Sequence, residues 1–333
     1  LVPVARHLQA RGVDQLGVAF VEEGVALRRA GISIPILVLG GIFGPQVAQF
    51  LEHDLEITVS SLDKLRQVEA TARAMGRKAT IHLKIDTGME RIGVHSYSAG
   101  PFIEAAAAST WCILKGIYSH LACADDPASP MTALQLERFN QACAHFERIG
   151  APMPLRHLAN SGGVLHFPET WLDIVRPGIA LYGVLPDPAS QPTIPLRPAL
   201  SLVSRVVFFK VVKAGNPVSY GATWASAVDT RVVTVPVGYG DGYPRALSSR
   251  GQVLLHGQPH PLVGRVCMDQ FMVDIGPEGS AYNEDEVVLI GRQGDAGIST
   301  EALAERAGTI PYEILTGLNE RIPREYIGGA DSR

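Results

Sequence analysis

The residues that could do chemistry in the first half of the chain stand where apolar segments end. Four such segments run into groups of polar or glycine-rich residues. In a parallel barrel the carboxyl-terminal strand ends face the active site, so side chains placed there can meet. A single histidine or arginine at such a place is more often structural than catalytic. Four groups in succession favour a shared site, formed by Lys84 and Arg91, His120, Asn160 and Ser161, and Arg176.

A second set of candidates lies in three glycine-containing segments of the second half. Tyr220 lies in VSYGAT, Tyr239 in VGYGDGYPR, and Met268 and Asp269 in GRVCMDQ. Ordinary hairpin turns with aromatic packing explain each segment equally well when it is taken alone. The residues by themselves leave both interpretations open.

The elements that must position the first set alternate between helical and strand patterns. Strands separated by helices of this length indicate βαβ units and a parallel sheet. The number of units is near eight, so we expect a TIM-type (β/α)8 barrel with its first strand missing; a doubly wound open sheet is the alternative, without a G-x-G-x-x-G segment to support it. The pattern predicts helices at residues 2–11 and 21–30, and strands at 16–20, 36–40, 57–59, 78–85, 116–119, 157–160 and 174–182.

The pattern changes after a proline-rich stretch at residues 186–198, which indicates a linker. We expect a barrel domain over residues 1–193 and a mainly antiparallel β domain over 194–333. The second domain carries a predicted turn at His256 and Gly257 and one predicted helix at 299–307. Its predicted strands are the β-branched runs at 202–212, 231–237, 252–266, 271–275 and 286–290.

Composition narrows the function classes. The chain has 333 residues, 46% of them hydrophobic, and a formal net charge of -4. No basic block points to nucleic acid, and no apolar run reaches the ~20 residues of a membrane helix. The four cysteines form no C-x-x-C pair and show no zinc-like spacing, so we expect no metal site and a reducing, cytoplasmic location.

Five segments together resemble the bacterial alanine racemase family: KIDTGMERIGV, SYGATW, VGYGDGYPR, GRVCMDQFMVDIG and GTIPYEIL. The match runs from Leu1 to about Arg324, with the segments in the family's order. The resemblance implies a pyridoxal 5'-phosphate cofactor, a TIM-type barrel, a C-terminal β domain and a homodimer. It also implies two-base racemisation of L-alanine and D-alanine, which supplies D-alanine for peptidoglycan.

The resemblance assigns the catalytic roles to Tyr220, His120 and Arg176. Arg176 would face the pyridine nitrogen of the cofactor. Arginine keeps its proton, so the ring nitrogen stays unprotonated and the ring is a weaker electron sink, which favours racemisation over decarboxylation or amino transfer. Tyr220 matches the family's tyrosine base. His120 and Arg176 would form a chain of contacts near this tyrosine and the ring.

The same resemblance assigns the binding positions. The cofactor would be held by His120, Asn160, Ser161, Arg176, Gly178, Ile179 and Tyr312. The substrate would contact Arg91, Met268, Asp269 and Tyr239. Residues such as Tyr220 and Met268 would come from the partner subunit, so that a monomer would be inactive.

Three further positions follow from the match. Lys84 corresponds to a lysine that some members carbamylate, and the added carboxylate would orient Arg91. Asp125 and Arg245 resemble a pair at the entrance to the site, where an exposed ion pair adds little stability. Glu90 replaces a residue that is often glycine in the family, directly beside Arg91.

One family residue has no counterpart in the printed sequence, the lysine that forms the imine with the cofactor. The family places it just before the helix with which this sequence begins, and the chain starts at Leu1 rather than at methionine. We therefore expect it upstream of Leu1. The alternatives are a truncated, inactive cofactor-binding homologue and a racemase for serine or a broader range of amino acids.

Overall fold

The computed structural model describes residues 1–187 and 194–327. Its contacts divide the chain into two compact units, which are described separately below. The first is Leu1–Pro177 with the C-terminal end from Tyr326, and the second is Gly178–Glu325. The expected domain boundary at 193 lies at the edge of the residues that are not described, and it stays a prediction.

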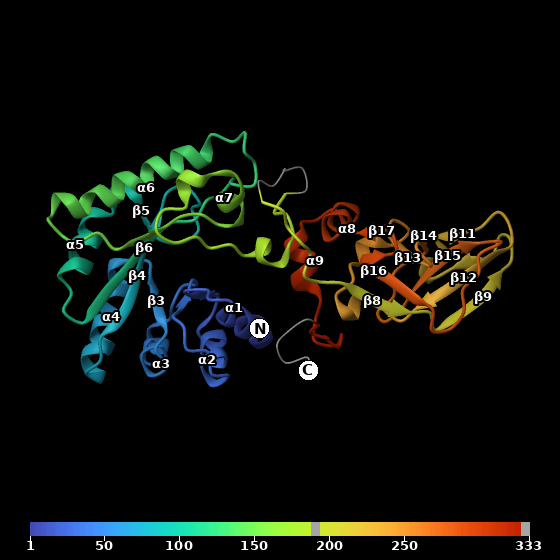
Figure 1. Cartoon of the computed structure of the whole chain (residues 1–333), viewed down its shortest axis with the longest axis horizontal. Coiled ribbons are helices and arrows are strands. Elements are labelled where there is room, and N and C mark those ends of the chain that lie inside the picture. The colour runs from blue at the N-terminus through green and yellow to red at the C-terminus, as the bar shows by residue number, and fades with distance from the viewer. Residues whose placement is uncertain (188–193, 328–333) are drawn as a thin grey trace. The chain divides into compact units, whose positions relative to one another are not determined.

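The first unit is built on a curled sheet whose parallel strands neighbour one another in chain order (Figure 1). A doubly wound sheet would reverse its strand order at a switch point, and this sheet does not. The barrel interpretation is therefore confirmed and the open-sheet alternative is wrong. The strands are β1 (Leu16–Val18), β2 (Ile36–Val38), β3 (Glu56–Val59), β4 (Ala79–Asp86), β6 (Cys112–Tyr118) and β7 (Leu155–His157), with the short β5 (Val94–His95) paired to β4.

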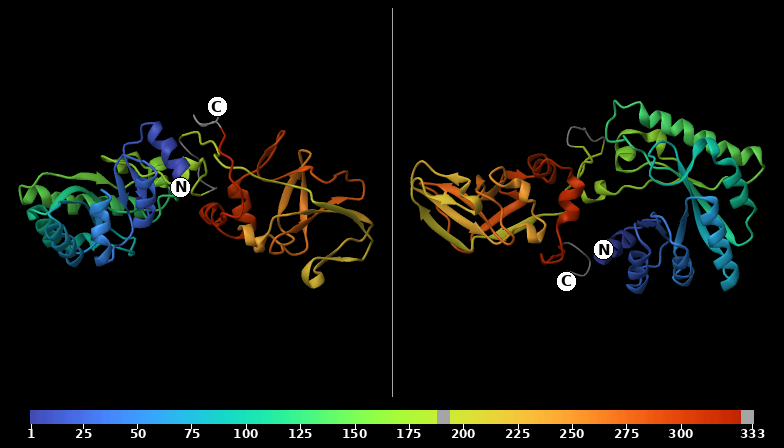
Figure 2. Two further views of the ribbon diagram at one scale, coloured as in Figure 1. Left: turned by 90° about the horizontal axis from the view of Figure 1, so that it is seen from below. Right: turned by 180° about the vertical axis from the view of Figure 1, so that it is seen from behind.

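Helices line the outer side of this sheet, and α2, α3 and α4 lie side by side in each view (Figures 1 and 2). In α4 (Leu62–Met75) the Ser61 hydroxyl accepts the Lys64 N–H at 3.1 Å, and Gly76 ends the helix with a φ of 64°. The other helices are α1 (Val2–Ala10), α2 (Val21–Arg29), α3 (Val47–Glu52), α5 (Gly100–Ala108), α6 (Met131–Arg148) and α7 (Ser161–His166).

The strand predicted at residues 174–182 is wrong. Ile174 makes a single parallel bridge to His157, and the chain then turns into the 3-10 helix Ile179–Tyr182. Pro177 has no N–H to donate to a neighbouring strand, so the pairing cannot continue through it. The break leaves Arg176 in the loop that follows the bridge, at the same edge as the ends of β4, β6 and β7.

The second unit holds a large antiparallel sheet of order β17-β16-β13-β14-β15-β12-β9, with β8 paired to β16. The expected turn at His256 and Gly257 joins β13 to β14, and both residues have the positive φ of a type I′ hairpin. The remaining strands are β10 (Pro217–Val218) and β11 (Trp224–Ala225), which form a small separate ribbon. The sheet strands are β8 (Leu202–Arg205), β9 (Phe208–Val212), β12 (Thr230–Val235), β13 (Gln252–Leu255), β14 (Gln258–Val263), β15 (Phe271–Gly276), β16 (Glu286–Gln293) and β17 (Ala296–Ile298).

The run at 202–212 is two strands rather than one continuous strand. Val206 donates its N–H to the Asp285 carbonyl, and Val207 donates to the Thr234 carbonyl, so the chain changes partner between them. Two helices complete the unit. The predicted helix is confirmed as α8 (Thr300–Ala307), capped by Ser299, and α9 (Pro311–Gly317) follows it.

Within residues 1–187 and 194–327, every helix falls short of the length and apolarity that a membrane span requires. The same residues contain no group of three or more histidine, cysteine or acidic side chains placed to bind a metal.

Candidate active site

The C-terminal strand ends of the first unit bring three large side chains into one layer. Lys84 on β4 is the register partner of Tyr118 on β6, and Tyr118 is the partner of His157 on β7. The His157 ring stacks on the Tyr118 ring with centroids 4.6 Å apart. The Lys84 Nζ and the Arg176 Cζ each lie 5.2 Å from the centre of the Tyr118 ring. Both positively charged groups lie within the range of cation–π attraction to this ring.

Arg176 is held by three hydrogen bonds. Its Nη1 donates to Nδ1 of His157 at 2.9 Å, and its Nη2 donates to the carbonyls of Ser119 at 2.7 Å and Leu158 at 3.1 Å. Burial lowers the pKa of the guanidinium to about 10, so the group remains a cation at neutral pH. These bonds fix the orientation of a half-buried positive charge at the edge where the strands end.

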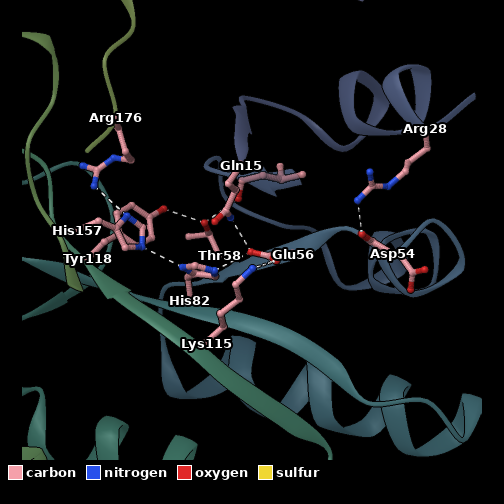
Figure 3. Close-up of polar contacts among 11 residues, drawn as sticks. Gln15, Arg28, Asp54, Glu56, Thr58, His82, Lys115, Tyr118, His157 and Arg176 are labelled. Atoms are coloured by element: carbon pink, nitrogen blue, oxygen red, sulfur yellow. Dashed lines mark hydrogen bonds and ion pairs between the residues drawn. The ribbon is translucent and has the colours of Figure 1, made fainter. Parts of the chain in front are cut away.

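Behind Arg176 lies a row of buried polar residues that sequence reasoning missed (Figure 3). His157 contacts His82 of β4, with Nε2 and Nδ1 2.9 Å apart, and Nε2 of His82 lies 2.8 Å from the Glu56 carboxylate. The side chains of His82 and His157 are almost fully buried. The sequence does hold a signal for His82: it lies two residues before Lys84 on the same predicted strand, so the two side chains point to the same face.

Lys84 is a buried lysine whose ammonium group has few hydrogen-bond partners to offset the loss of water. It is 3% exposed, and its Nζ donates to the Ile85 carbonyl at 3.2 Å. Burial, reinforced by the charge of Arg176, lowers its pKa to about 7. A substantial fraction of this amine is neutral at physiological pH, and a neutral amine is a nucleophile.

Arg91 follows β4 in a loop that is organised by Asp86. One carboxylate oxygen of Asp86 accepts the N–H groups of Gly88, Met89 and Glu90, and the other accepts the N–H of Arg91 at 3.2 Å. Burial would raise the pKa of Asp86, but these backbone hydrogen bonds outweigh it and the pKa is lowered. The Arg91 side chain itself is exposed.

Glu90, which stands where the family often has glycine, keeps the backbone conformation that favours glycine. It adopts a φ of 52°, in the left-handed region where glycine is favoured. Its carboxylate lies 2.9 Å from Nε2 of His95, so it points to that histidine.

His120 and the start of α7 complete the first set. Burial lowers the pKa of His120 to about 3, helped by the charges of Arg176 and Lys84, so the imidazole is neutral. The expected direct chain from Arg176 to His120 is not formed by hydrogen bonds among the described residues, because the guanidinium bonds His157 instead. Asn160 caps α7 by accepting the Gly163 N–H at 3.0 Å, and Ser161 is buried next to it.

The second unit gathers four of the other candidates around adjacent loops. Tyr239 donates its N–H to the Cys267 carbonyl, and the next N–H, that of Gly240, goes to Met268. The Ser219 hydroxyl donates to the Arg265 carbonyl at 2.6 Å, which ties the turn carrying Tyr220 to the same loop. The Tyr220 and Met268 side chains are 71% and 54% exposed.

Asp269 is fixed by Arg321, whose Nη2 donates to its carboxylate at 2.7 Å. Tyr312 belongs to α9, and the chain beyond α9 packs back on the Tyr239 loop through the Asn319 side chain, which donates to the Gly240 carbonyl at 2.7 Å. Gly178 follows Arg176 after Pro177 and is the N-cap of the 3-10 helix that begins at Ile179.

The candidates thus fall into two groups, one in each unit. The first unit brings together Lys84, Arg91, His120, Asn160, Ser161 and Arg176. The second holds Gly178, Ile179, Tyr220, Tyr239, Met268, Asp269 and Tyr312. Of the expected entrance pair, Asp125 lies in the first unit and Arg245 in the second.

Comparison with known proteins agrees with this arrangement. The family model "Alanine racemase, N-terminal domain" matches residues 1–186, and "Alanine racemase, C-terminal domain" matches residues 199–326. An alanine racemase of Symbiobacterium thermophilum is 44% identical over 98% of this chain and 87% of its own length.

Solved structures give the same result. The alanine racemase of a D-cycloserine-producing Streptomyces lavendulae superimposes with a TM-score of 0.93 at 40% identity, covering 98% of this chain and 87% of that one. A histidine racemase of Leuconostoc mesenteroides has a TM-score of 0.86 at 29% identity, covering 98% and 87%. With both family models matched and such identity over nearly its whole length, this chain belongs to the alanine racemase family.

Proposed function

We propose that this protein is an amino-acid racemase that interconverts L-alanine and D-alanine, with pyridoxal 5'-phosphate as its cofactor. The observation that carries the proposal is Arg176, a half-buried cation that three hydrogen bonds fix at the strand ends of a chain that belongs to the alanine racemase family. An arginine at the cofactor ring selects for proton exchange at the α-carbon over other reactions of this cofactor.

The donors of Arg176 fit the cofactor ring. A guanidinium has five N–H groups, and three of those of Arg176 are used by His157 and two carbonyls. Among the described residues, Nε–H and one Nη1–H have no partner. Arg176 would donate to the pyridine nitrogen, and because arginine does not give up its proton, that nitrogen would stay unprotonated.

The cofactor, when bound, draws electrons from the substrate α-carbon so that its proton can leave. Tyr220 would hold or deliver that proton at its phenolic oxygen on one face. The base for the other face in the family is the cofactor lysine, which has no counterpart in the printed sequence. His120 is neutral and can therefore accept or donate a hydrogen bond near the ring without adding charge.

The remaining residues would bind and orient. Hydroxyls and backbone N–H groups suit a phosphate, and we assign that role to Ser161, Gly178, Ile179 and Tyr312, with Asn160 positioning Ser161. We propose that the Arg91 guanidinium and the Met268 N–H bind the substrate carboxylate. Asp269 and Tyr239 would line the same subsite from adjacent loops.

Lys84 would carry a carbamate. Its neutral amine attacks carbon dioxide, a C–N bond forms and one proton is released, which leaves a carboxylate on the side chain. The lysine lies among positive charges, since Arg176 and Arg91 both lower its pKa. A negative group would reverse this repulsion and orient Arg91.

The active unit would be a homodimer in which Tyr220 and Met268 serve the site of the partner subunit. Both side chains are more than half exposed, although both match functional positions. Large exposed side chains at such positions are typical of interface residues. We place the activity in the cytoplasm, supplying D-alanine for peptidoglycan; the free cysteines agree with a reducing compartment.

An amino acid other than alanine is the alternative substrate, because a histidine racemase shares this fold. A serine or broad-specificity enzyme belongs to the same alternative. Alanine is favoured because identity to an alanine racemase is 44%, against 29% to the histidine racemase.

The test is a chiral assay on the protein as its gene encodes it, supplied with pyridoxal phosphate. We expect L-alanine to be converted to an equal mixture of both forms, faster than serine or histidine. Tyr220→Phe should lower the rate at least ~100-fold while cofactor binding persists, because it removes one proton carrier. No turnover of any amino acid would support an inactive cofactor-binding homologue, and preference for another amino acid would correct the substrate.

A further inference from the structure

The buried row behind Arg176 runs through the interior of the first sheet from one end of its strands to the other (Figure 3). Glu56 is the first residue of β3, His82 lies in the middle of β4, and His157 is the last residue of β7. The three side chains are 7%, 0% and 1% exposed. Buried polar groups of this kind are costly unless each hydrogen bond is made, so their arrangement is tightly specified.

Chemistry leaves only one arrangement of protons along this row. The guanidinium of Arg176 can only donate, so Nδ1 of His157 must accept. His157 then carries its proton on Nε2 and donates it to Nδ1 of His82. His82 must in turn carry its proton on Nε2, which donates to the Glu56 carboxylate. A second proton on either ring would set two N–H groups against each other.

The ionisation states agree with this order. Burial lowers the pKa of both His82 and His157, and the positive charge of Arg176 lowers both further. The hydrogen bond to Glu56 raises the pKa of His82 but does not outweigh these effects. Burial would raise the pKa of Glu56, but hydrogen bonds from His82 and Lys115 outweigh it and the carboxylate stays charged. Both rings are neutral, with an anion at one end and a cation at the other.

The Glu56 carboxylate, at the far end of the row, is held by two further contacts besides His82. The Lys115 ammonium contacts one oxygen of Glu56, and Gln15 donates to the other oxygen at 2.6 Å. Both groups are donors, so they hold the carboxylate as an acceptor toward His82. Because Glu56 cannot turn away or act as a donor here, the direction of the whole row is set from this end.

The packing around the row has no spare room. Gly116 faces His82 across β4 and β6, and a Cβ on Gly116 would lie 2.7 Å from Cε1 of the His82 ring. The Tyr118 ring stacks on His157 with an interplanar angle of 8°. The Tyr118 hydroxyl is itself tied to Thr58, 2.8 Å away. The rings therefore cannot rotate to exchange their nitrogens.

We propose that Glu56 and His82 are positioning residues for Arg176: by fixing the tautomer of His157 they hold the guanidinium in the orientation that leaves its Nε–H free for a ring nitrogen. The inference rests on the proposed function only in naming the pyridine ring as the acceptor. The fixed proton arrangement is a property of the chain itself.

The first experiment therefore needs no cofactor. Nitrogen-15 NMR of histidine-labelled protein reports the tautomer and charge of each ring, with assignment by single histidine variants. We expect His82 and His157 to be neutral with the proton on Nε2 between about pH 6 and pH 8, although a free histidine titrates there. A proton on Nδ1 of either ring, or a positive charge on either, overturns the proposal.

The second experiment removes the anchor. Glu56→Leu has nearly the same volume but no acceptor for His82, whereas Glu56→Gln keeps a carbonyl oxygen that can accept the same proton. We compare binding of pyridoxal phosphate with its 1-deaza analogue, in which carbon replaces the ring nitrogen. The ratio of the two affinities isolates the contact of Arg176 with that nitrogen.

We expect Glu56→Leu to lower this ratio about three- to tenfold, the size of one hydrogen bond, and Glu56→Gln to restore it. A ratio within twofold of wild type in folded Glu56→Leu overturns the proposal. If that variant does not fold, the NMR result on the wild-type chain decides. Equal affinity of the wild type for both compounds would contradict the assignment of Arg176 in the proposed function and leave the tautomer result standing.

The matched control is another histidine–carboxylate pair of the first unit, the one that joins α5 and α6. Nε2 of His145 on α6 lies 2.8 Å from the Glu104 carboxylate on α5, the same distance as in the His82 pair, but away from Arg176. Glu104→Leu should leave both the affinity ratio and the tautomers of His82 and His157 unchanged. A similar fall in the ratio for Glu104→Leu would show a general effect on stability and count against a positioning role.

Discussion

At the scale of single residues, the environment of a side chain decides what it can do. Lys84 and Lys210 have the same chemical group, but Lys84 is 3% exposed beside Arg176 and Lys210 lies on the exposed strand β9. Burial is the larger cause of the lowered pKa of Lys84, and repulsion by Arg176 adds to it. The reactive amine is created by its surroundings.

Lys84 is predicted to form a carbamate as the pH rises through about 7. Only the neutral amine reacts, and its fraction grows above that pH. Carbon-13 NMR with labelled bicarbonate should show one protein carbamate signal that increases from about pH 6 to pH 8. The signal should vanish in Lys84→Met and persist in Lys210→Met. A signal that survives in Lys84→Met would place the modification elsewhere.

The same shift has a consequence for stability. The pKa of Lys84 falls from 10.5 to about 7 on folding, so the unfolded chain binds the proton more tightly. The charged lysine therefore destabilises the folded state fully below pH 7, and this cost fades as the pH rises toward 10.5. Lys84→Met should accordingly stabilise the protein more at low pH than at high pH.

At the scale of elements, loops at strand ends are held by side chains that lie within the strands. Asp86, the last residue of β4, accepts four successive backbone N–H groups and thereby shapes the loop that presents Arg91. A carboxylate can do this because both of its oxygens accept. Asp86 therefore fixes the backbone position from which the Arg91 side chain extends.

Asp86→Asn is predicted to raise KM for alanine about three- to tenfold with a smaller change in kcat. The amide retains one acceptor oxygen and turns a donor toward the remaining N–H groups, which loosens the loop carrying Arg91. Steady-state kinetics in both directions measures the effect. Asp229→Asn is the control, since Asp229, directly before β12, also accepts a backbone N–H, that of Ala214, but belongs to the second unit rather than to the Arg91 loop. Unchanged KM in Asp86→Asn would contradict the role of this loop.

At the scale of the whole molecule, the candidate residues are divided between two compact units. Arg176 and Arg91, which we propose to contact the cofactor ring and the substrate carboxylate, belong to the first, and Tyr220, the proposed base, belongs to the second. Because Tyr220 is largely exposed, it is available to a partner subunit. A shared site makes activity a property of the assembly.

Mixing two inactive variants tests this sharing. Tyr220→Phe and Arg91→Gln chains should each be nearly inactive as homodimers. In a mixed dimer one site receives both intact residues, so unfolding and refolding equal amounts together should restore about a quarter of wild-type activity. Size-exclusion chromatography checks that dimers have formed. No recovery in well-formed mixed dimers would mean that Tyr220 and Arg91 serve one site from the same chain.

The sequence by itself determined much of this protein. Local apolar periodicity located β1, β2 and α8 close to their observed ends, since these depend on neighbouring residues. The site residues were recognisable because their types and spacing resemble a known family, although neither composition nor periodicity assigns them a role. Pro177, which ends the strand pairing after Ile174, is visible in the sequence, and its lack of an N–H predicts a shorter strand than the apolar run at 174–182 suggests.

Only the tertiary structure decided how those residues are supported. Glu56, His82, His157 and Tyr118 lie far apart in the sequence, and sheet register alone places them in contact. The same holds for the lowered pKa of Lys84, which arises from burial among groups on other strands. Desolvation and hydrogen-bond direction are properties of a three-dimensional arrangement, so no local pattern along the chain encodes them.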